Sequence, residues 1–155
     1  MAGHVFPALE KCCIIFPHHA DSIHASQPVT MPSCSFLLYH SNDLHPLTLF
    51  HLPPLDALDV KNVQWNIWRG NPQLAILCPI VAASPQGLTI LCLDVRCSEQ
   101  LLLFILKLAP ALEELWLGLA HPNALSKTFF CAFTVSKKTV PQKVKFHLSS
   151  KLLPR

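Results

Sequence analysis

The chain has 155 residues, of which 51% are hydrophobic and 14% are charged, and its formal net charge at pH 7 is +3. This length suits one domain with a moderate core or a short solenoid. Only four glycines occur, and the sequence contains neither a Gly-rich phosphate-binding loop nor a Gly-x-Ser-x-Gly element, which argues against nucleotide chemistry and serine hydrolysis. We therefore expect a protein that is not an enzyme, that has no small-molecule substrate and that uses no cofactor.

The mean hydropathy of +0.37 is high for a soluble protein, but no segment is typical of a membrane span. The longest apolar run, residues 101–120, contains a lysine, a proline and two glutamates, and the run over residues 74–83 is too short to cross a bilayer. The N-terminus lacks the charged and apolar regions of a secretory signal. Seven cysteines at irregular intervals are typical of reduced thiols. These features predict a cytoplasmic or nuclear protein that does not contact a membrane.

Five short segments share one apolar spacing, Φ-x-x-Φ-x-Φ, in which Φ is an apolar residue. Four of them have a proline two residues before the first Φ, and one has its proline, Pro85, a residue earlier. The first Φ residues are Leu9, Cys34, Leu55, Leu88 and Leu112. They lie 25, 21, 33 and 24 residues apart, which is the length and core signature of a leucine-rich repeat. The sequence therefore predicts an α/β fold: a short leucine-rich-repeat solenoid with parallel strands on one face and helices or loops on the other.

Two other interpretations of this spacing stay open. A second register of the third repeat, through Val60, Val63 and Trp65, would make the steps between repeats more even. A chain with 51% hydrophobic residues and 14 prolines would also produce some matches by chance.

Alternation along each strand predicts which residues face a partner. The last two Φ side chains of a segment point together into the solenoid, and the residue between them points to the open, concave face. One predicted column is Cys13, Leu38, Asp59, Cys92 and Trp116, and a second, two positions earlier, is Lys11, Phe36, Ala57, Ile90 and Glu114. The candidate partner-binding residues are Cys13, Leu38, Asp59, Cys92, Asp94, Glu114 and Trp116.

Trp116 is the candidate anchor for a partner protein, because a large aromatic side chain with one polar group often dominates interfaces. The alternative is that Trp116 packs on the following helix near Phe129. The acidic residues of the same face, Asp59, Asp94 and Glu114, favour a basic target.

The connecting segments predict short helices and loops. One or two helical turns are expected over residues 18–25, a loop with a short apolar piece over 41–52, and a short or kinked helix over 73–83, which Pro79 interrupts. Ser98 is placed to begin the strongest helix, residues 101–108, which stops before Pro110. Asn123 can cap a helix over residues 124–133, and residues 144–148 alternate as an edge strand would.

We divide the chain into a repeat region of about five repeats, residues 1–134, and a basic tail, residues 135–155, that is either disordered or a terminal strand. No acid follows Glu114, whereas seven lysines and arginines do. A basic tail can bind phosphate backbones. In residues 135–155 only Phe146 lies among the lysines as an aromatic residue for base stacking, so the sequence does not favour a nucleic-acid partner.

Cysteines and histidines near the N-terminus suggest an alternative function, that of a small metal- or nucleic-acid-binding protein. These residues are Cys12, Cys13, His18, His19, His24 and Cys34. Zinc prefers four such ligands in closely spaced pairs, and that spacing is missing here. Adjacent residues of a strand also face opposite sides, which separates Cys12 from Cys13. We therefore predict no metal site and keep this function as the alternative.

Two stretches carry motifs beyond the apolar spacing. They are Pro110-Ala-Leu-Glu-Glu-Leu-Trp-Leu-Gly-Leu119 with His121-Pro-Asn-Ala-Leu-Ser-Lys-Thr-Phe-Phe130, and Gln64-Trp-Asn-Ile-Trp-Arg-Gly-Asn-Pro-Gln-Leu74 with Leu77-Cys-Pro-Ile80. Both resemble the repeat region of a large family of fungal F-box-like, leucine-rich-repeat proteins, over about residues 6–133. The resemblance implies a substrate receptor of a cullin-type ubiquitin ligase, in which the repeats hold the target and the F-box holds the ligase adaptor.

The sequence departs from that family at its start, where no helical F-box segment precedes the repeats. We therefore expect the repeat portion alone. It would serve as a protein-protein interaction scaffold without the ligase-docking module, or it would be a truncated gene fragment with no independent function.

Overall fold

The structure, a computed structural model, describes residues 4–16, 27–41, 43–61, 75–84, 87–94, 98–119, 125–127, 129, 131 and 145–150. These residues include two parallel β-sheets, the α-helices α1 (Leu77–Ala82) and α2 (Glu99–Leu108) and the 3-10 helix η1 (His45–Leu49), and positions 127, 129 and 131 are helical as well. The α/β class predicted from the sequence is therefore confirmed.

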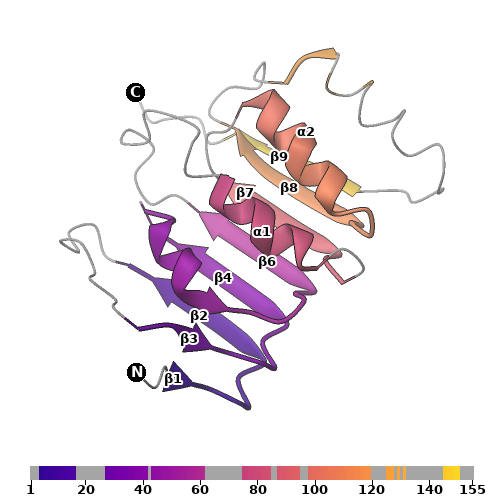
Figure 1. Ribbon diagram of the computed structural model, residues 1–155. Coiled ribbons are helices and arrows are strands. Elements are labelled where there is room, and N and C mark those ends of the chain that lie inside the picture. Colours follow the sequence, from indigo (N-terminus) through magenta and orange to yellow (C-terminus); the bar gives the residue numbers. More distant parts are fainter. Residues whose placement is uncertain are drawn as a thin grey trace.

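The larger sheet has six strands, which the chain adds one after another (Figure 1). Every strand runs parallel to its neighbours, in the order β2-β4-β6-β7-β8-β9. Their bounds are β2 (Lys11–Ile15), β4 (Phe36–His40), β6 (Ala57–Lys61), β7 (Ile90–Asp94), β8 (Glu114–Leu119) and β9 (Lys145–Ser150). Parallel neighbours need a long return connection, and those connections carry the helices and much of the smaller sheet.

The smaller sheet consists of three parallel strands of two residues each, in the order β1-β3-β5. They are β1 (His4–Val5), β3 (Val29–Thr30) and β5 (Phe50–His51). Pro7 and Pro32 lie in the turns that lead from β1 to β2 and from β3 to β4, where a residue without an N–H costs no hydrogen bond. The two turns contact each other, since the Ser33 hydroxyl donates to the Pro7 carbonyl at 2.6 Å. The sequence did not predict this sheet.

The apolar spacing agrees with the register of the larger sheet. Two inward rows cross strands β4 to β8, and every member of both rows is buried: Leu37, Leu58, Leu91 and Leu115 in one, and Tyr39, Val60, Leu93 and Leu117 in the other. The register of the third repeat through Leu58 and Val60 is therefore confirmed. Val63 and Trp65, on which the second register depended, lie outside the described residues.

Strand β2 differs because, among the described residues, it has a neighbouring strand on one side only. Cys12 and Ile14 pair with Leu37 and Tyr39, yet both are only half-buried, and so is Leu9. The expected burial of the Φ residues is thus confirmed for four segments and holds only in part for the first.

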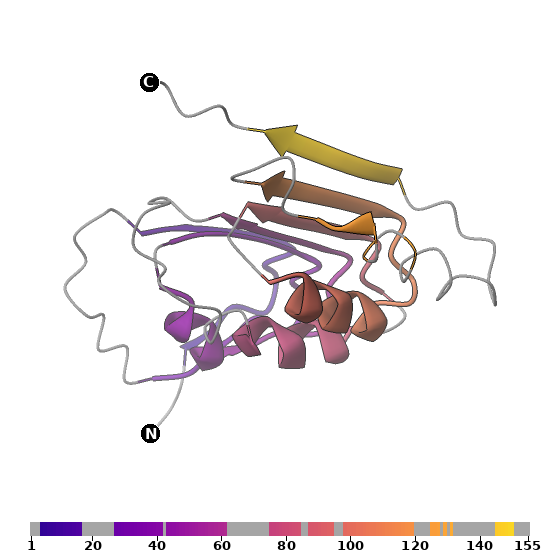
Figure 2. The same ribbon diagram turned by 90° about the horizontal axis from the view of Figure 1, so that it is seen from above.

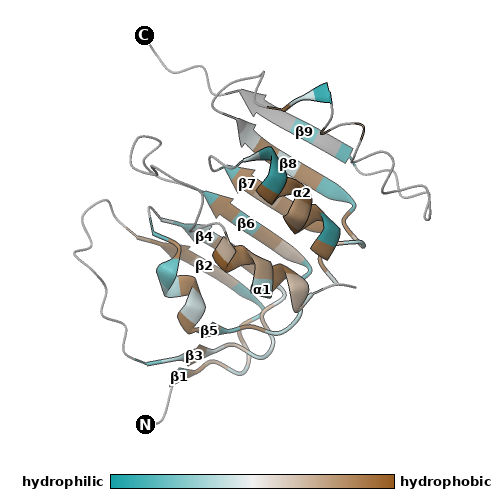
Figure 3. Ribbon diagram, turned by 45° about the horizontal axis from the view of Figure 1, so that its top comes forward, coloured by the Kyte–Doolittle hydropathy of each residue, from teal (hydrophilic) through white to brown (hydrophobic). Residues whose placement is uncertain are grey.

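The described helices lie along one face of the larger sheet (Figure 2). Helix α2 (Glu99–Leu108) follows Ser98, whose hydroxyl accepts a hydrogen bond from the Leu101 N–H at 3.3 Å. The predicted start of this helix is therefore confirmed. Leu102 and Ile105 point into the core, and Figure 3 shows α2 as hydrophobic along its middle and hydrophilic toward its ends.

Helix α1 (Leu77–Ala82) is a short helix within the predicted range of residues 73–83. Pro79 occupies its third position, where the missing N–H would have had no partner inside the helix. The proline therefore fits the first turn instead of kinking the helix. Leu77 and Val81, one turn apart, are buried.

A 3-10 helix, η1 (His45–Leu49), forms where the sequence predicted a loop over residues 41–52. Asp43 holds its start, because the carboxylate accepts a hydrogen bond from the His45 N–H at 2.9 Å and the carbonyl accepts one from the Tyr39 hydroxyl at 2.7 Å. Leu47 then reaches the core. The loop prediction was wrong because it ignored these side-chain contacts.

The described residues include all of some remaining predicted elements and only part or none of others. Strand β9 confirms the strand expected near residues 144–148 and lies in the predicted basic tail. Residues 18–25 lie outside the described residues. Of residues 124–133, the structure describes 125–127, 129 and 131; positions 127, 129 and 131 are helical, and Phe129 is buried. The Ser126 hydroxyl accepts a hydrogen bond from the Phe129 N–H at 3.2 Å, whereas the predicted cap, Asn123, lies outside the described residues.

Candidate binding face

The side of the larger sheet opposite the helices, which we call the open face, carries two rows of side chains. The first row is Cys13, Leu38, Asp59, Cys92, Trp116 and His147, and the second is Lys11, Phe36, Ala57, Ile90, Glu114 and Lys145. The five predicted members of each row pair in register, and β9 adds a sixth to each. The predicted columns are therefore confirmed as rows of the sheet.

Trp116 lies on the open face with 43% of its surface exposed. Its ring stacks on that of His147, with 3.7 Å between the ring centroids and 8° between the planes. Leu115 and Leu117 fill the core side of β8, so alternation turns Trp116 away from the core to which Phe129 belongs. The alternative placement of Trp116 beside Phe129 is therefore wrong.

Two ion pairs join described residues of the open face. Lys61 Nζ lies 3.1 Å from Asp59 Oδ2, and Lys145 Nζ lies 2.9 Å from Glu114 Oε1. Hydrogen bonds from Lys145, and then from Trp116, hold the pKa of Glu114 below its ordinary value, and the bond to Glu114 raises the pKa of Lys145. Lysines of the chain itself thus neutralise part of the acidic charge that was expected to favour a basic target.

A pocket of about 440 Å³ opens on the open face above β6, β7 and β8. Its lining residues are Asp59, Lys61, Cys92, Leu93, Asp94, Trp116, Leu117 and Gly118. Burial, followed by the charge of Asp59, raises the pKa of the Cys92 thiol to about 11. The thiol is therefore protonated at neutral pH and is a poor nucleophile.

The pocket gathers four of the seven predicted binding residues: Asp59, Cys92, Asp94 and Trp116. Glu114 lies on the same strand as Trp116, two residues away. Cys13 is on β2 and Leu38 on β4, toward the other end of the open face. The structure thus separates these two residues from the pocket.

Sequence reasoning missed three residues of this region, namely Lys61, Gly118 and His147. Alternation already places Lys61 on the same side as Asp59, two residues earlier in β6. Alternation along the strand predicted over residues 144–148 places His147 on the open face, but its pairing with Trp116 follows only from the register of β9. Nothing in the spacing singled out Gly118.

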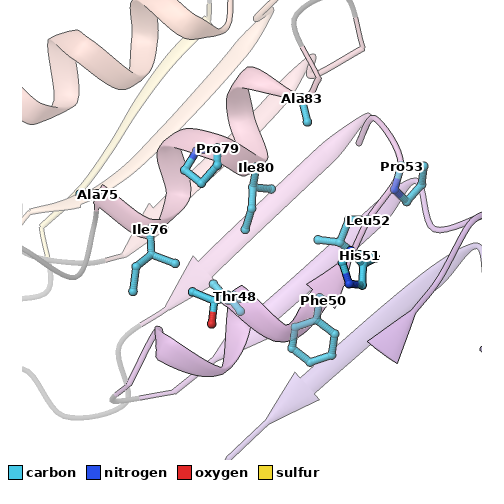
Figure 4. A pocket seen from close by; sticks show the side chains of 11 residues that line it. Thr48, Phe50, His51, Leu52, Pro53, Ala75, Ile76, Pro79, Ile80 and Ala83 are labelled. Carbon is cyan, nitrogen blue, oxygen red and sulfur yellow. The ribbon is translucent and has the colours of Figure 1, made fainter. Parts of the chain in front are cut away.

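A second hollow, of about 590 Å³, lies between η1, β5 and α1 (Figure 4). Its lining residues are Leu47, Thr48, Phe50, His51, Leu52, Pro53, Ala75, Ile76, Pro79, Ile80 and Ala83. His51 is the one titratable side chain among them, and the lining offers it no acidic or nucleophilic partner. This hollow therefore offers apolar contact and no catalytic chemistry.

Within the described ranges, no group of three or more His, Cys, Asp or Glu side chains is placed to hold a metal ion. Cys12 is half-buried and Cys13 exposed, as expected for neighbours on a strand. Burial, and then the nearby Cys34, raises the pKa of the Cys12 thiol. The histidines of the suggested cluster, at positions 18, 19 and 24, lie outside the described residues.

No helix in the part of the chain that the structure describes is long and apolar enough to span a bilayer.

No protein-family model, curated protein or solved structure matches this chain.

Proposed function

We propose that this chain is a leucine-rich-repeat solenoid that works as a non-enzymatic protein-protein interaction scaffold. The observation that supports the proposal is the arrangement of the larger sheet, whose parallel strands follow one another in chain order with the described helices on one side. Repeat folds of this kind present an extended surface to another macromolecule. The open face is that surface in this chain.

The side chains of the open face support recognition of a protein. Trp116 offers a large, partly exposed aromatic surface, and tryptophan is among the residue types that dominate binding energy at interfaces. The ion pair of Glu114 with Lys145 lies on the same two strands as Trp116 and His147, and the ion pair of Asp59 with Lys61 lies across the pocket. Polar groups commonly surround the apolar centre of an interface in this way.

Within this class, we propose that the chain recognises a target protein in the manner of the repeats of a ubiquitin-ligase receptor. The motifs at residues 64–80 and 110–130 support this role through their resemblance to such repeats. The target then contacts the open face around Trp116.

Site-specific photocrosslinking tests the scaffold function. A benzophenone amino acid replaces Trp116 on the open face, and in a matched control it replaces Phe104 of α2, an aromatic residue that is 52% exposed on the helix side. We expect the variant at position 116 to crosslink a discrete protein in native cells, and the variant at position 104 to crosslink it much less. Equal labelling from both positions, or crosslinks to nucleic acid in place of protein, would contradict the proposal.

A further inference from the structure

The first row of the open face has a gap between two larger side chains. Asp59, Cys92 and Trp116 pair in register on adjacent strands, so the backbones of Asp59 and Trp116 are two strand spacings, or roughly 10 Å, apart. The small thiol of Cys92 between them leaves the pocket of about 440 Å³. A group that enters this pocket has a carboxylate on one side and an indole on the other.

The indole of Trp116 is held in a fixed orientation. His147 covers one face of the ring at 3.7 Å, and the Trp116 side chain makes a hydrogen bond with Glu114. Because His147 lies on β9, the other face of the indole looks toward Cys92 on β7. The wall of the pocket on this side is therefore an aromatic face.

The middle of the pocket is electrically negative even though Lys61 stands at its rim. At the Cys92 sulfur, Asp59 raises the pKa of the thiol more than Lys61 lowers it. The Asp59 side chain is 14% exposed and that of Lys61 is 40% exposed, so water screens the lysine more than the acid. In addition, Oδ1 of Asp59 is buried and has no hydrogen-bond partner among the described residues.

We propose that this pocket binds the guanidinium group of an arginine side chain of the partner protein. The inference rests on the proposed function, because it names the residue that the open face receives. The guanidinium stacks on the free face of Trp116 and donates hydrogen bonds to Asp59, replacing the contact of Asp59 with Lys61. Arginine fits this pocket better than lysine, because a planar guanidinium can stack on an aromatic ring and bond to a carboxylate at the same time.

An NMR titration of the full chain tests this proposal. The probe is N-acetyl-arginine amide, and the control is N-acetyl-citrulline amide, which has nearly the same shape but no charge. The reporter is the indole N–H signal of Trp116, identified by its loss in Trp116→Phe. We expect a saturable shift with the arginine probe and binding weaker by roughly tenfold with the citrulline probe, because its neutral ureido group lacks the positive charge that strengthens hydrogen bonds to Asp59.

Two variants should change the affinity for the arginine probe in opposite directions. Asp59→Asn removes the carboxylate and should weaken binding by roughly tenfold. Lys61→Met removes the competing ammonium while keeping an apolar stem, and should tighten binding by about threefold. Glu10→Gln changes an exposed acid that precedes β2, at the far end of the sheet, and should leave the affinity unchanged. Circular dichroism establishes that each variant is folded.

Three results would overturn the proposal: no saturable shift in either the natural chain or Lys61→Met, equal binding of the two probes, or affinity that does not respond to Asp59→Asn in a folded chain. Photocrosslinking at position 116 reports separately on the proposed function. A protein crosslink without arginine binding would remove this inference alone. Arginine binding without a protein crosslink would remove the scaffold function and leave the pocket as a guanidinium site with no protein partner.

Discussion

Asp94 of β7 occupies the space that the β-carbon of a side chain at Gly118 of β8 would need. A β-carbon built on Gly118 would lie 2.6 Å from Asp94 Cγ and 3.0 Å from Asp94 Cα. Asp94 is only 8% exposed, so its carboxyl group has little room to move aside. The close approach of these two strands beneath the pocket therefore depends on glycine.

Gly118→Ala should consequently lower the free energy of unfolding by about 1–3 kcal/mol, the usual cost of overpacking. Urea unfolding followed by circular dichroism measures this change. The double variant Asp94→Ala with Gly118→Ala should cost less than the two single changes added together, because alanine at position 94 removes the crowded carboxyl group. Strictly additive costs would show that the two side chains do not compete for this space.

Trp116→Ala should reduce recovery of the partner protein and leave the chain folded, because Trp116 lies on the open face outside the buried core. Phe129→Ala is the contrasting change. Phe129 is fully buried, so its truncation should cost about 3–5 kcal/mol of stability. Thermal unfolding of both variants, together with quantification of the captured partner, separates the two roles. Unfolding of Trp116→Ala would assign that residue to the core.

Stability should fall at high pH because of Tyr39. This side chain is buried, and burial is the main cause that raises its pKa from 10.0 to about 12. The folded state thus prefers the neutral phenol, so the stabilisation is fully present below pH 10 and is lost as the pH rises through about 12. The loss should be at most about 2–3 kcal/mol, by the equivalence of one pKa unit to about 1.4 kcal/mol.

Tyr39→Phe serves as the control for this pH dependence, measured as urea midpoints between pH 9 and 12. Cys92 also titrates in this range, with a pKa raised to about 11, so the informative quantity is the difference between the two proteins. A steep loss of stability that persists unchanged in Tyr39→Phe would assign the effect to other groups.

The edge of the larger sheet at β2 should promote association of the chain with itself. Ile15 of β2 is 62% exposed. Within the described residues, β2 pairs with β4 on one side and with no strand on the other. Ile15→Lys should reduce aggregation in light scattering, because lysine on an edge strand opposes further pairing. Its free energy of unfolding should change by no more than about 0.5 kcal/mol. Unchanged aggregation would show that another surface of the chain causes the association.

The rows of the larger sheet were predictable because the Φ-x-x-Φ-x-Φ spacing indicates to which side of the strand each side chain points. Asp59, Cys92 and Trp116 are far apart in the sequence, yet one rule of alternation was enough to bring them together. The same rule separated Cys12 from Cys13. It works because a one-residue slip of any strand would expose its whole apolar set.

Other features left no such periodic signal. A strand of two residues, such as His4–Val5, is too short to show alternation. The start of η1 depends on hydrogen bonds to Asp43, which the spacing of apolar residues does not express. The contacts of Trp116 with His147 and of Glu114 with Lys145 require the register of β9, and the long connection between β8 and β9 leaves that register unspecified in the sequence.

The alternation of side chains separates the residues that build the core from those that face outward, where we propose that a partner binds. Leu91 and Leu93 hold β7 in the core, whereas Cys92 between them is not among the buried core residues. A change at an outward position such as Cys92 leaves the apolar pattern that orients the strand unchanged. Outward positions with room around them, such as Cys92 and Trp116, can therefore vary independently of the core, whereas Asp94 and Gly118 cannot, because they are packed against each other. If the proposed function holds, a change of specificity at these outward positions needs no compensating change in the interior.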